Sequence, residues 1–229
     1  MKDLNLKGKK PSSTIEDYLG IIFCLERDGK IVRGVKLAKL MDVSAPTVTV
    51  TLKRMLRDNW IKINNKKEIT LTALGKEAAR SVIRRHMLTE WMLARIFNIP
   101  WSKVHSEAHK IEHTISKDVA IHLQKRLDNP KVCPHGNPLP GYENIAKNWI
   151  PLTSVPKGTK VIIRRIYEME EENSGFLSFL EVNGILPGRI AIVEKILLFN
   201  DTLSIRIGKK VVTLGMKTAE KIFVEVNTA

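Results

Sequence analysis

The chain has 229 residues, 43% of them hydrophobic, which suits two or more globular domains and excludes a largely disordered protein. A formal net charge of +14 at pH 7 favours a polyanionic partner, nucleic acid before an anionic membrane. No apolar run approaches the ~18 residues that span a bilayer, and the basic N-terminus lacks the apolar segment of a secretion signal. Two cysteines, Cys24 and Cys133, make no disulfide framework, so we expect a cytoplasmic protein.

The N-terminal part of the chain is the most basic. Residues 1–76 hold 16 Lys and Arg against 8 Asp and Glu, so they carry +8 of the net charge. Residues 1–11 are expected to form a mobile basic arm. The stretch from Ser12 to Glu16 then predicts a helix start, with Ser13 as N-cap, and an apolar stripe follows to about Gly29. A basic first domain of this kind favours contact with a nucleic acid.

Two short helices with a tight turn between them predict a helix-turn-helix. The first covers 33–41, the turn is at Asp42, and Ser44 caps the second, with Pro46 in its first turn. We expect the second helix to read DNA with residues at its cap and on its outer face, which are Ser44, Ala45, Pro46, Thr47, Thr49, Val50, Lys53 and Arg54. The competing interpretation is a generic three-helix domain with a solvated basic surface.

A short hairpin is expected directly after the helix-turn-helix. Residues 60–63 and 68–71 have the composition of strands, and the polar run 64–67 separates them as a turn. Such a hairpin is the wing of a winged helix-turn-helix. Lys66 and Lys67 at its tip are suited to contact DNA phosphates.

Long helices are predicted next, over 72–97, from Trp101, and over about 116–127. His86 and Glu90 lie four residues apart on one face of the first, a spacing that metal ligands can use. Adjacent apolar helices beside a winged helix-turn-helix usually form a dimer interface, because operators are often palindromic. Burial within one protomer is the competing explanation.

The helix from Trp101 gathers three of the six histidines. At ~100° per residue, four ligand-type side chains share an arc of about 100°, namely His105, His109, Glu112 and His113. His105 lies ~12 Å of axial rise from His113, so one ion should not bind all four. The spacing therefore predicts two neighbouring divalent-metal sites. The alternative is a solvated polar helix face.

Residues 128–156 are predicted to form a long connector rich in Pro and Gly. It contains Cys133 and His135, whose spacing alone is a weak metal signal. Beyond it we expect a short helix over 171–182 and a small five-stranded barrel, with strands at 161–166, 189–193, 203–207 and 222–226 among its members. The fold class is therefore mainly α with a small β domain, divided as 1–72, 73–142 and 143–229.

Four motifs in this order resemble the diphtheria-toxin-repressor and manganese-repressor family of metal-dependent transcriptional regulators. They are Asp17-Tyr-Leu, Ser44-Ala-Pro-Thr-Val48, Val104-His-x-Glu-Ala-His-x-x-Glu-His113 and Cys133-Pro-His-Gly-Asn-Pro-Leu-Pro-Gly141. The resemblance runs from about Ser13 to Val226. It implies a winged helix-turn-helix, a helical dimerisation domain and an SH3-like barrel related to the ferrous-transport protein A domain.

The resemblance also implies two metal sites. The primary site, which activates DNA binding, would consist of Asp17, His109, Glu112 and His113. The ancillary site would consist of His86, Glu90 and His105, completed either by Glu171 or Glu172 from the barrel domain or by Cys133 and His135 from the connector. His109 stands where iron-responsive members have Cys and manganese-responsive members have Glu, and Gly20 replaces a Glu ligand of the manganese members. The choice between Fe²⁺ and Mn²⁺ stays open, with Co²⁺, Ni²⁺ and Zn²⁺ as surrogates.

The expected function is a cytoplasmic, homodimeric repressor of metal homeostasis, activated by a divalent metal and bound to a palindromic operator, with no membrane partner. The alternatives are a metal-dependent hydrolase or a metal-storage protein that uses the His/Glu site. A hydrolase needs an open metal position and a placed base, as in His-Glu-x-x-His, and this motif is absent from the sequence. A storage protein would not need the helix-turn-helix. We therefore expect a protein that is not an enzyme.

Overall fold

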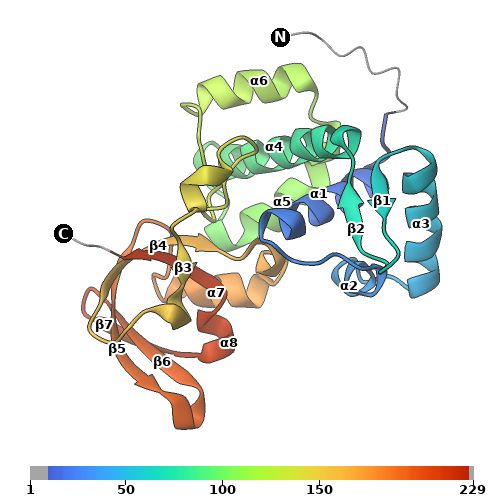
Figure 1. Cartoon of the computed structure of the whole chain (residues 1–229). Coiled ribbons are helices and arrows are strands. Elements are labelled where there is room, and N and C mark those ends of the chain that lie inside the picture. The colour runs from blue at the N-terminus through green and yellow to red at the C-terminus, as the bar shows by residue number, and fades with distance from the viewer. Residues whose placement is uncertain (1–9, 227–229) are drawn as a thin grey trace. The chain divides into compact units, whose positions relative to one another are not determined.

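The computed structural model describes residues 10–226 (Figure 1). It divides into two compact units, one ending at Ile83 and one beginning at Arg84. The basic arm expected over residues 1–11 lies, up to Lys9, outside the described residues. Within the described part of the chain, no helix is long and apolar enough to cross a membrane.

The first unit contains three helices, a hairpin and the start of a long helix. The elements are α1 (Ser13–Arg27), α2 (Gly34–Leu40), α3 (Ala45–Arg57), β1 (Ile61–Ile63), β2 (Ile69–Leu71) and the first half of α4 (Ala73–Arg95). The expected N-cap of α1 was one residue late. Ser12 is the N-cap, with extended backbone angles and no hydrogen bond from its side chain, and Ser13 is the first helical residue.

The helix-turn-helix forms as its sequence predicts. Ser44 Oγ accepts a hydrogen bond from Thr47 N at 3.3 Å, which satisfies one of the free amides at the start of α3. Asp42 takes a positive φ of 49° in the turn between α2 and α3, a conformation that Asp tolerates better than most residues. Val48 and Met55 are buried on the inner face of α3. This leaves the opposite face of the helix exposed.

The hairpin pairs in antiparallel register, with Ile61 opposite Leu71 and Ile63 opposite Ile69. Its turn is organised by Asn64, whose side-chain oxygen accepts from the backbone amides of Lys66 and Glu68, both at 2.9 Å. The alternation along β2 buries Ile69 and Leu71. Lys66 and Lys67, in the turn between the two strands, are exposed.

Helices form one layer of the second unit. They are the second half of α4, α5 (Val104–Ile111) and α6 (Lys117–Arg126), with 3-10 turns at Trp101–Lys103 and Glu112–Thr114. The sequence predicted one α-helix over 101–113, and this was wrong at both ends. Only Val104–Ile111 is α-helical, so Glu112 and His113 lie on a tighter turn of about three residues.

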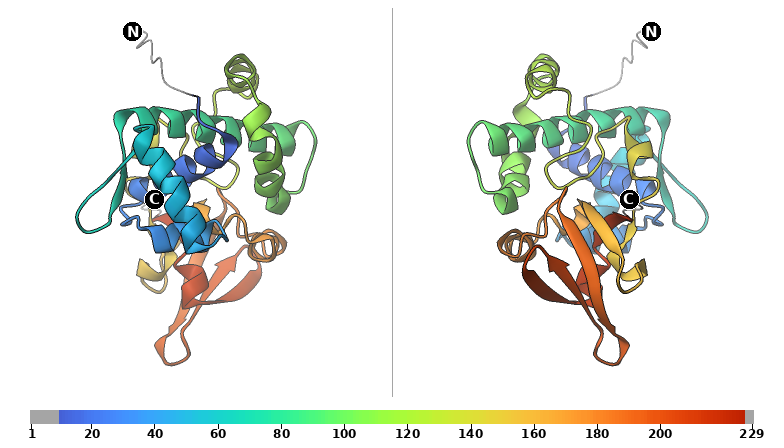
Figure 2. Two further views of the ribbon diagram at one scale, coloured as in Figure 1. Left: turned by 90° about the vertical axis from the view of Figure 1, so that its right-hand side faces the viewer. Right: turned by 90° about the vertical axis from the view of Figure 1, so that its left-hand side faces the viewer.

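The barrel domain consists of six antiparallel strands, in the order β3-β8-β4-β5-β6-β7, among the described residues. They are β3 (Ile150–Pro151), β4 (Lys160–Ile166), β5 (Ile190–Leu197), β6 (Thr202–Ile207), β7 (Lys210–Gly215) and β8 (Ile222–Val226), with helices α7 (Ser174–Val182) and α8 (Met216–Ala219). The expected count of five strands was wrong. The expected helix over 171–182 begins only at Ser174, and the long connector includes β3 and two short 3-10 turns. Figure 2 shows the strands, in yellow to red, as a strongly curved sheet.

The connector binds the barrel domain to the helical layer within the second unit. Trp91 Nε1, on α4, donates to Val132 O at 2.7 Å, and Ile166 N, on β4, donates to His135 O at 2.9 Å. Gly136 has a φ of +89°, and a Cβ there would lie 1.9 Å from Arg164 O, so only glycine allows this approach. From α7, Glu181 accepts from Trp101 N at 3.0 Å and from Ser102 Oγ at 2.6 Å, at the start of the α5 segment.

Candidate metal centres

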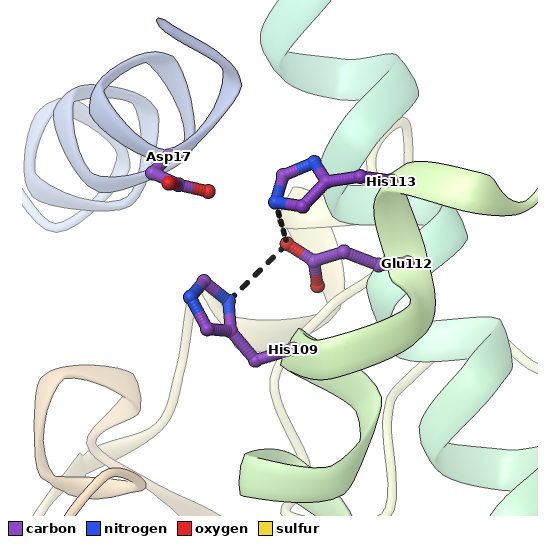
Figure 3. A group of neighbouring side chains, drawn as sticks. All are labelled: Asp17, His109, Glu112 and His113. Carbon is purple, nitrogen blue, oxygen red and sulfur yellow. Dashed lines mark ion pairs between the residues drawn. The ribbon is translucent and has the colours of Figure 1, made fainter. Parts of the chain in front are cut away.

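The end of α5 and the following 3-10 turn bring three ligand-type side chains together, which we call the first centre: His109, Glu112 and His113 (Figure 3). Glu112 Oε1 lies 3.3 Å from His109 Nδ1 and 3.5 Å from His113 Nε2. The Glu112 side chain is 5% exposed, whereas that of His109 is 47% exposed. Two imidazoles and a carboxylate facing one point can bind a divalent ion that arrives from solvent.

Glu112 is held from two directions. Its Oε2 pairs with His86 Nδ1, and its backbone oxygen accepts from Arg85 Nε at 3.1 Å. Burial alone would raise the pKa of Glu112, but hydrogen bonds from His109 and His86 outweigh burial and lower it to about 2. The carboxylate is therefore ionised and oriented before any ion binds. Figure 3 also draws Asp17, which lies half-buried on α1 in the first unit.

A second group of ligands is buried between α4 and α5. His86 Nε2 lies 3.0 Å from His105 Nδ1 and 3.2 Å from Glu90 Oε1, and His105 Nδ1 lies 3.1 Å from the same oxygen. These three atoms form a nearly equilateral triangle. An ion bound at 2.0–2.2 Å holds neighbouring ligand atoms about 3.0–3.4 Å apart, so the triangle fits one face of a coordination shell.

Glu90 also belongs to a third group, with Cys133, His135 and Glu171. His135 Nδ1 lies 3.3 Å from Glu90 Oε1 and 3.4 Å from Glu171 Oε2, and all four residues are buried. Their four ligand atoms lie within 4.8 Å of one another. The connector and the barrel domain thus bring a thiol, an imidazole and a carboxylate to the same glutamate that faces the histidines of α4 and α5. We call the second and third groups together the second centre.

Of the two adjacent glutamates, Glu171 is the inner one. Its Oε2 lies 2.9 Å from His105 Nδ1 and its side chain is 1% exposed, whereas Glu172 Oε1 lies 3.4 Å from His105 Nε2 on a side chain that is 64% exposed. Asn137 Nδ2 donates to Glu171 Oε1 and, at 2.9 Å, to Ile166 O. The sequence left both glutamates open because they follow a 3-10 turn, where neither helical nor strand periodicity tells which side chain points inward.

The chemistry of the second and third groups suits metal ions. His135 Nε2 lies 3.1 Å from the carbonyl of Trp101, which can only accept, so this nitrogen carries a proton and Nδ1 faces the carboxylates of Glu90 and Glu171. Burial would lower the pKa of His135, but Glu171 and Glu90 outweigh it and raise the pKa, and a metal ion would take the place of the proton on Nδ1. Burial would lower the pKa of His86, but Glu90 and Glu112 outweigh it and raise the pKa to about 10. Burial, with Glu90 and Glu171 nearby, raises the pKa of the Cys133 thiol. A bound cation would reverse this effect, because metals bind the thiolate.

The DNA-binding residues expected from the sequence are all exposed in the first unit. They are Ser44, Ala45, Pro46, Thr47, Thr49, Val50, Lys53 and Arg54 on and before α3, and Lys66 and Lys67 in the hairpin turn. The hydroxyl of Thr49 donates to Ala45 O at 2.9 Å, and those of Ser44 and Thr47 lie 2.8 Å apart. Because these hydroxyls are bonded within the helix, the exposed face of α3 offers mainly methyl groups to a partner. Lys53 and Arg54 add two cations on α3, and Lys66 and Lys67 add two in the hairpin turn.

Comparison with known proteins assigns each part of the chain. Residues 10–69 match the iron dependent repressor N-terminal DNA binding domain, residues 72–141 match the iron dependent repressor metal binding and dimerisation domain, and residues 150–226 match the FeoA domain. The iron-dependent repressor IdeR of Mycobacterium tuberculosis is 33% identical over 192 residues, covering 79% of this chain and 84% of the relative. The diphtheria toxin repressor of Corynebacterium diphtheriae is 29% identical over 194 residues, covering 80% and 85%.

Solved structures agree with this assignment. A manganese-dependent transcriptional repressor in complex with manganese has a TM-score of 0.82 and 26% identity, covering 93% of this chain and all of that one. ScaR with bound Zn²⁺ has a TM-score of 0.77 and 28% identity, covering 94% and 99%. These findings confirm the expected fold class, repressor function and divalent-metal cofactor, and they favour the repressor over the hydrolase or storage alternatives. The chain belongs to the diphtheria toxin repressor family of metal-dependent transcriptional repressors.

Proposed function

We propose that this protein is a cytoplasmic homodimeric repressor, without enzymatic activity, that binds a palindromic operator when Fe²⁺ or Mn²⁺ fills its primary site. The observation that carries the proposal is the convergence of His109, Glu112 and His113 at the end of α5, in a part of the chain that matches a metal binding and dimerisation domain. The domains are taken as 1–72 for DNA binding, 73–142 for dimerisation and metal binding, and 143–229 for the barrel.

Asp17 would be the fourth ligand of the primary site. It lies on α1 in the domain that carries the helix-turn-helix, whereas the other three ligands lie in the second unit. An ion that takes ligands from both parts favours the arrangement in which Asp17 reaches it. A ligand shifts an equilibrium only through such a preference for one state, so metal would select one orientation of the DNA-reading helices.

The donor set supports activation by metals that accept nitrogen and oxygen ligands. Asp17, His109, Glu112 and His113 offer two imidazoles, two carboxylates and no thiolate, so a preference for soft metals should be weak. Fe²⁺, Mn²⁺ and Co²⁺ are all expected to activate. His86, Glu90 and His105 would form the ancillary site, together with ligands from the connector and barrel domain.

Dimerisation is supported by apolar side chains that remain exposed in the part of the chain matching the dimerisation domain. Ile96 and Phe97, just beyond α4, are 51% and 61% exposed, and Val119 and Ile121 on α6 are 46% and 43% exposed. A second copy would cover such a surface, and a two-fold dimer would present two α3 helices to two half-sites.

The test is DNA affinity with and without metal. Operators are selected from random duplexes in the presence of Mn²⁺, and affinity is then measured by fluorescence anisotropy with a chelator or with saturating Mn²⁺ or Fe²⁺. We expect the chelator to weaken binding at least tenfold, a coupling of about 1.4 kcal/mol. A scrambled duplex is the control. Equal operator affinity in both conditions would reject metal gating, and equal affinity for the scrambled duplex would reject sequence-specific repression.

A further inference from the structure

Strand β7 forms one edge of the barrel sheet and pairs only with β6 in the described part of this domain. In an antiparallel pair, every second residue turns its backbone N–H and C=O toward the neighbouring strand, and the residues between turn theirs away. Met216 N donates to Asp201 O at 2.7 Å, in register with the β6–β7 pairs, and this fixes the alternation. The backbone groups of Val211, Thr213 and Gly215 therefore point away from the sheet.

The outer edge of β7 is open. No backbone hydrogen bond from another described element reaches Val211, Thr213 or Gly215. A Cβ placed on Gly215 would meet no atom within 4 Å, so there is free space beside the end of the strand. The side chain of Val211 is 52% exposed. An open edge of this kind is a template on which another extended segment can form main-chain hydrogen bonds.

The edge is also basic at both ends. Residues 208–217 contain Lys209, Lys210 and Lys217, all exposed, and no acidic residue. Lys209 and Lys210 lie at the beginning of β7, and Lys217 lies just beyond its end. Lysines in such positions repel another basic strand and attract an acidic one, because opposite charges across a strand pair stabilise it and like charges destabilise it.

These charges disfavour the occupants that the chain itself could supply. Two β7 strands that pair antiparallel about Thr213 would place Lys209 of one copy opposite the second copy's Lys217. Any antiparallel register would bring three lysines from each copy to the same seam. Residues 1–9 hold three Lys and one Asp, so the N-terminal segment is basic as well. An acidic segment of another protein is the complementary occupant.

The end of α7 adds apolar side chains next to this edge. Lys210 Nζ lies 3.4 Å from Val182 O, so the C-terminal end of α7 lies near the beginning of β7. Val182 is 75% exposed, and Phe179, three residues earlier, is 41% exposed. Because side chains alternate along a strand, Lys210 lies on the same face of β7 as the buried Val212. Apolar side chains at alternate positions of an added strand would face the same way, toward α7.

We propose that the β7 edge binds an extended acidic segment of a partner protein, which adds to the barrel sheet as a further strand. Main-chain hydrogen bonds to Val211, Thr213 and Gly215 supply the affinity, and Asp or Glu near the ends of the segment pair with the lysines. The segment has alternating β-branched or apolar residues between these acids and no Pro in its middle. This inference does not rest on metal binding, and its experiments are done in the presence of a chelator.

The first experiment selects peptides of about ten residues, the length of a long strand, from a random phage-displayed library. The bait is the full-length wild-type protein, and Val211→Pro protein is used for counter-selection. The affinity of the most enriched peptide is then measured by fluorescence anisotropy. We expect acidic peptides with alternating β-branched or apolar residues. No enrichment, enrichment of peptides without acids, or equal affinity for Val211→Pro would overturn the proposal.

Variants separate the main-chain contribution from the charges. Val211→Pro removes an outward N–H, which an edge strand tolerates, and should weaken peptide binding at least about tenfold. Val211→Thr keeps the N–H and the branched shape and is the matched control, with affinity close to that of the wild type.

The charge variant does not depend on how a proline is accommodated. Lys209→Glu combined with Lys210→Glu should also weaken peptide binding at least about tenfold, because both side chains are exposed and would now repel the acids. Lys147→Glu, at an exposed site in the connector, is the matched control and should bind the peptide like the wild type. Wild-type affinity in the double variant would overturn the proposal.

Amide hydrogen exchange, followed by nuclear magnetic resonance, locates the bound peptide. The N–H groups of Val211, Thr213 and Gly215 should exchange more slowly in the peptide complex. Those of Val212 and Leu214 already face β6 and should change little. Unchanged exchange of the three outward amides at saturating peptide would place the peptide elsewhere. Displacement of the peptide by a scrambled DNA duplex would assign the lysines to nucleic acid, and either result would overturn the proposal.

Discussion

His86 is the residue that connects the first and second centres. Its Nδ1 pairs with Glu112 of the first centre, while its Nε2 lies 3.2 Å from Glu90 and 3.0 Å from His105 of the second. In the metal-free protein the imidazolium form satisfies both carboxylates. A metal ion at Nε2 would displace the proton there and leave Nδ1 to donate to Glu112. The same ring can therefore orient Glu112 in both states.

The raised pKa of His86 predicts how stability depends on pH without metal. Carboxylates raise this pKa from 6.5 to about 10, so the imidazolium stabilises the fold fully below pH 6.5, and this contribution is lost as pH rises toward 10. The lowered pKa of Glu112 acts in the other direction, since its contribution is present above pH 4.5 and lost as pH falls toward 2. We expect the urea midpoint of the chelated protein to fall between pH 6.5 and 9, and to fall less in His86→Gln.

The matched control for this prediction is His122→Gln, which changes an exposed histidine on α6 and should keep the wild-type pH dependence. His105 and His135 also have raised pKa values because of Glu171 and Glu90, despite burial, so part of the dependence should survive in His86→Gln. Identical curves for wild type and His86→Gln would contradict the assignment of this proton to His86. With metal bound the trend should reverse, because metal displaces these protons.

His109 and His105 share α5, but we assign them to different centres. His109→Ala should keep the fold, because a helix accepts alanine readily, and should abolish metal-dependent DNA binding. His105→Ala should reduce it less, since we assign His105 to the ancillary group, beside Glu90. The measurement is metal-titrated operator affinity for both variants side by side. If His109→Ala is activated like the wild type while His105→Ala is not, the division of this helix into two centres is wrong.

At the scale of elements, we expect α3 to contact both bases and phosphates of DNA, and the hairpin to contact phosphates. The exposed small side chains from Ser44 to Val50 favour methyl contacts with thymine over bidentate hydrogen bonds, because their hydroxyls are bonded within the helix. Lys53, Arg54, Lys66 and Lys67 should bind phosphates. Lys53→Ala is therefore predicted to weaken binding to all duplexes and to reduce the slope of log affinity against log salt by about one.

Lys209→Ala is the matched control for Lys53→Ala. It removes the same charge from an exposed residue between β6 and β7, outside the DNA-binding domain, and should leave the salt slope unchanged. A Lys53→Ala variant that changes sequence preference but keeps the wild-type slope would instead place Lys53 at a base edge.

The sequence predicted elements well where one periodicity dominates and poorly where chain geometry changes within a few residues. The helix-turn-helix and hairpin follow from a cap at Ser44 and strand alternation after Trp60, and both are present. The stretch 101–113 was predicted as one α-helix because its ligand-type side chains share one face at helical spacing. Its final turn is 3-10, where Thr114 Oγ1 bonds back to Ile111 O at 2.7 Å, and such local bonding has no periodic signal.

For the candidate centres too, ligands close together in the sequence could be predicted, whereas ligands brought together by tertiary contacts could not. The histidines of α5 were recognisable from spacing, since His105 and His109 lie one helical turn apart. Joining them to Cys133, His135 and Glu171 required tertiary contacts, because these ligands come from the connector and from the turn after β4. The family resemblance offered the connector and the barrel as alternatives, and the structure brings ligands from both to Glu90.

At the scale of the whole molecule, the barrel domain brings Glu171 to the second centre and also supports this centre through Glu181, which is not one of its candidate ligands. From α7, Glu181 accepts hydrogen bonds from Trp101 N, Ser102 N and Ser102 Oγ, at 3.0, 3.3 and 2.6 Å. The carboxylate thereby caps the segment that leads into α5, three residues before His105. Trp101 O also accepts from His135 Nε2, so one short segment positions two ligands from different elements.

Loss of this cap is therefore predicted to weaken the second centre without removing a ligand. Glu181→Ala should reduce Co²⁺ affinity there by about tenfold, the lower end of the effect seen when groups that orient metal ligands are removed. The first centre should keep its affinity, because His109 lies near the other end of α5 and Glu112 lies in the 3-10 turn that follows it. The measurement is a Co²⁺ titration followed through the Cys133–cobalt absorption. Glu194→Ala is the control, since it removes a carboxylate that pairs with Arg206 on the sheet. Equal titration curves for both variants would show that the barrel does not position these ligands through Glu181.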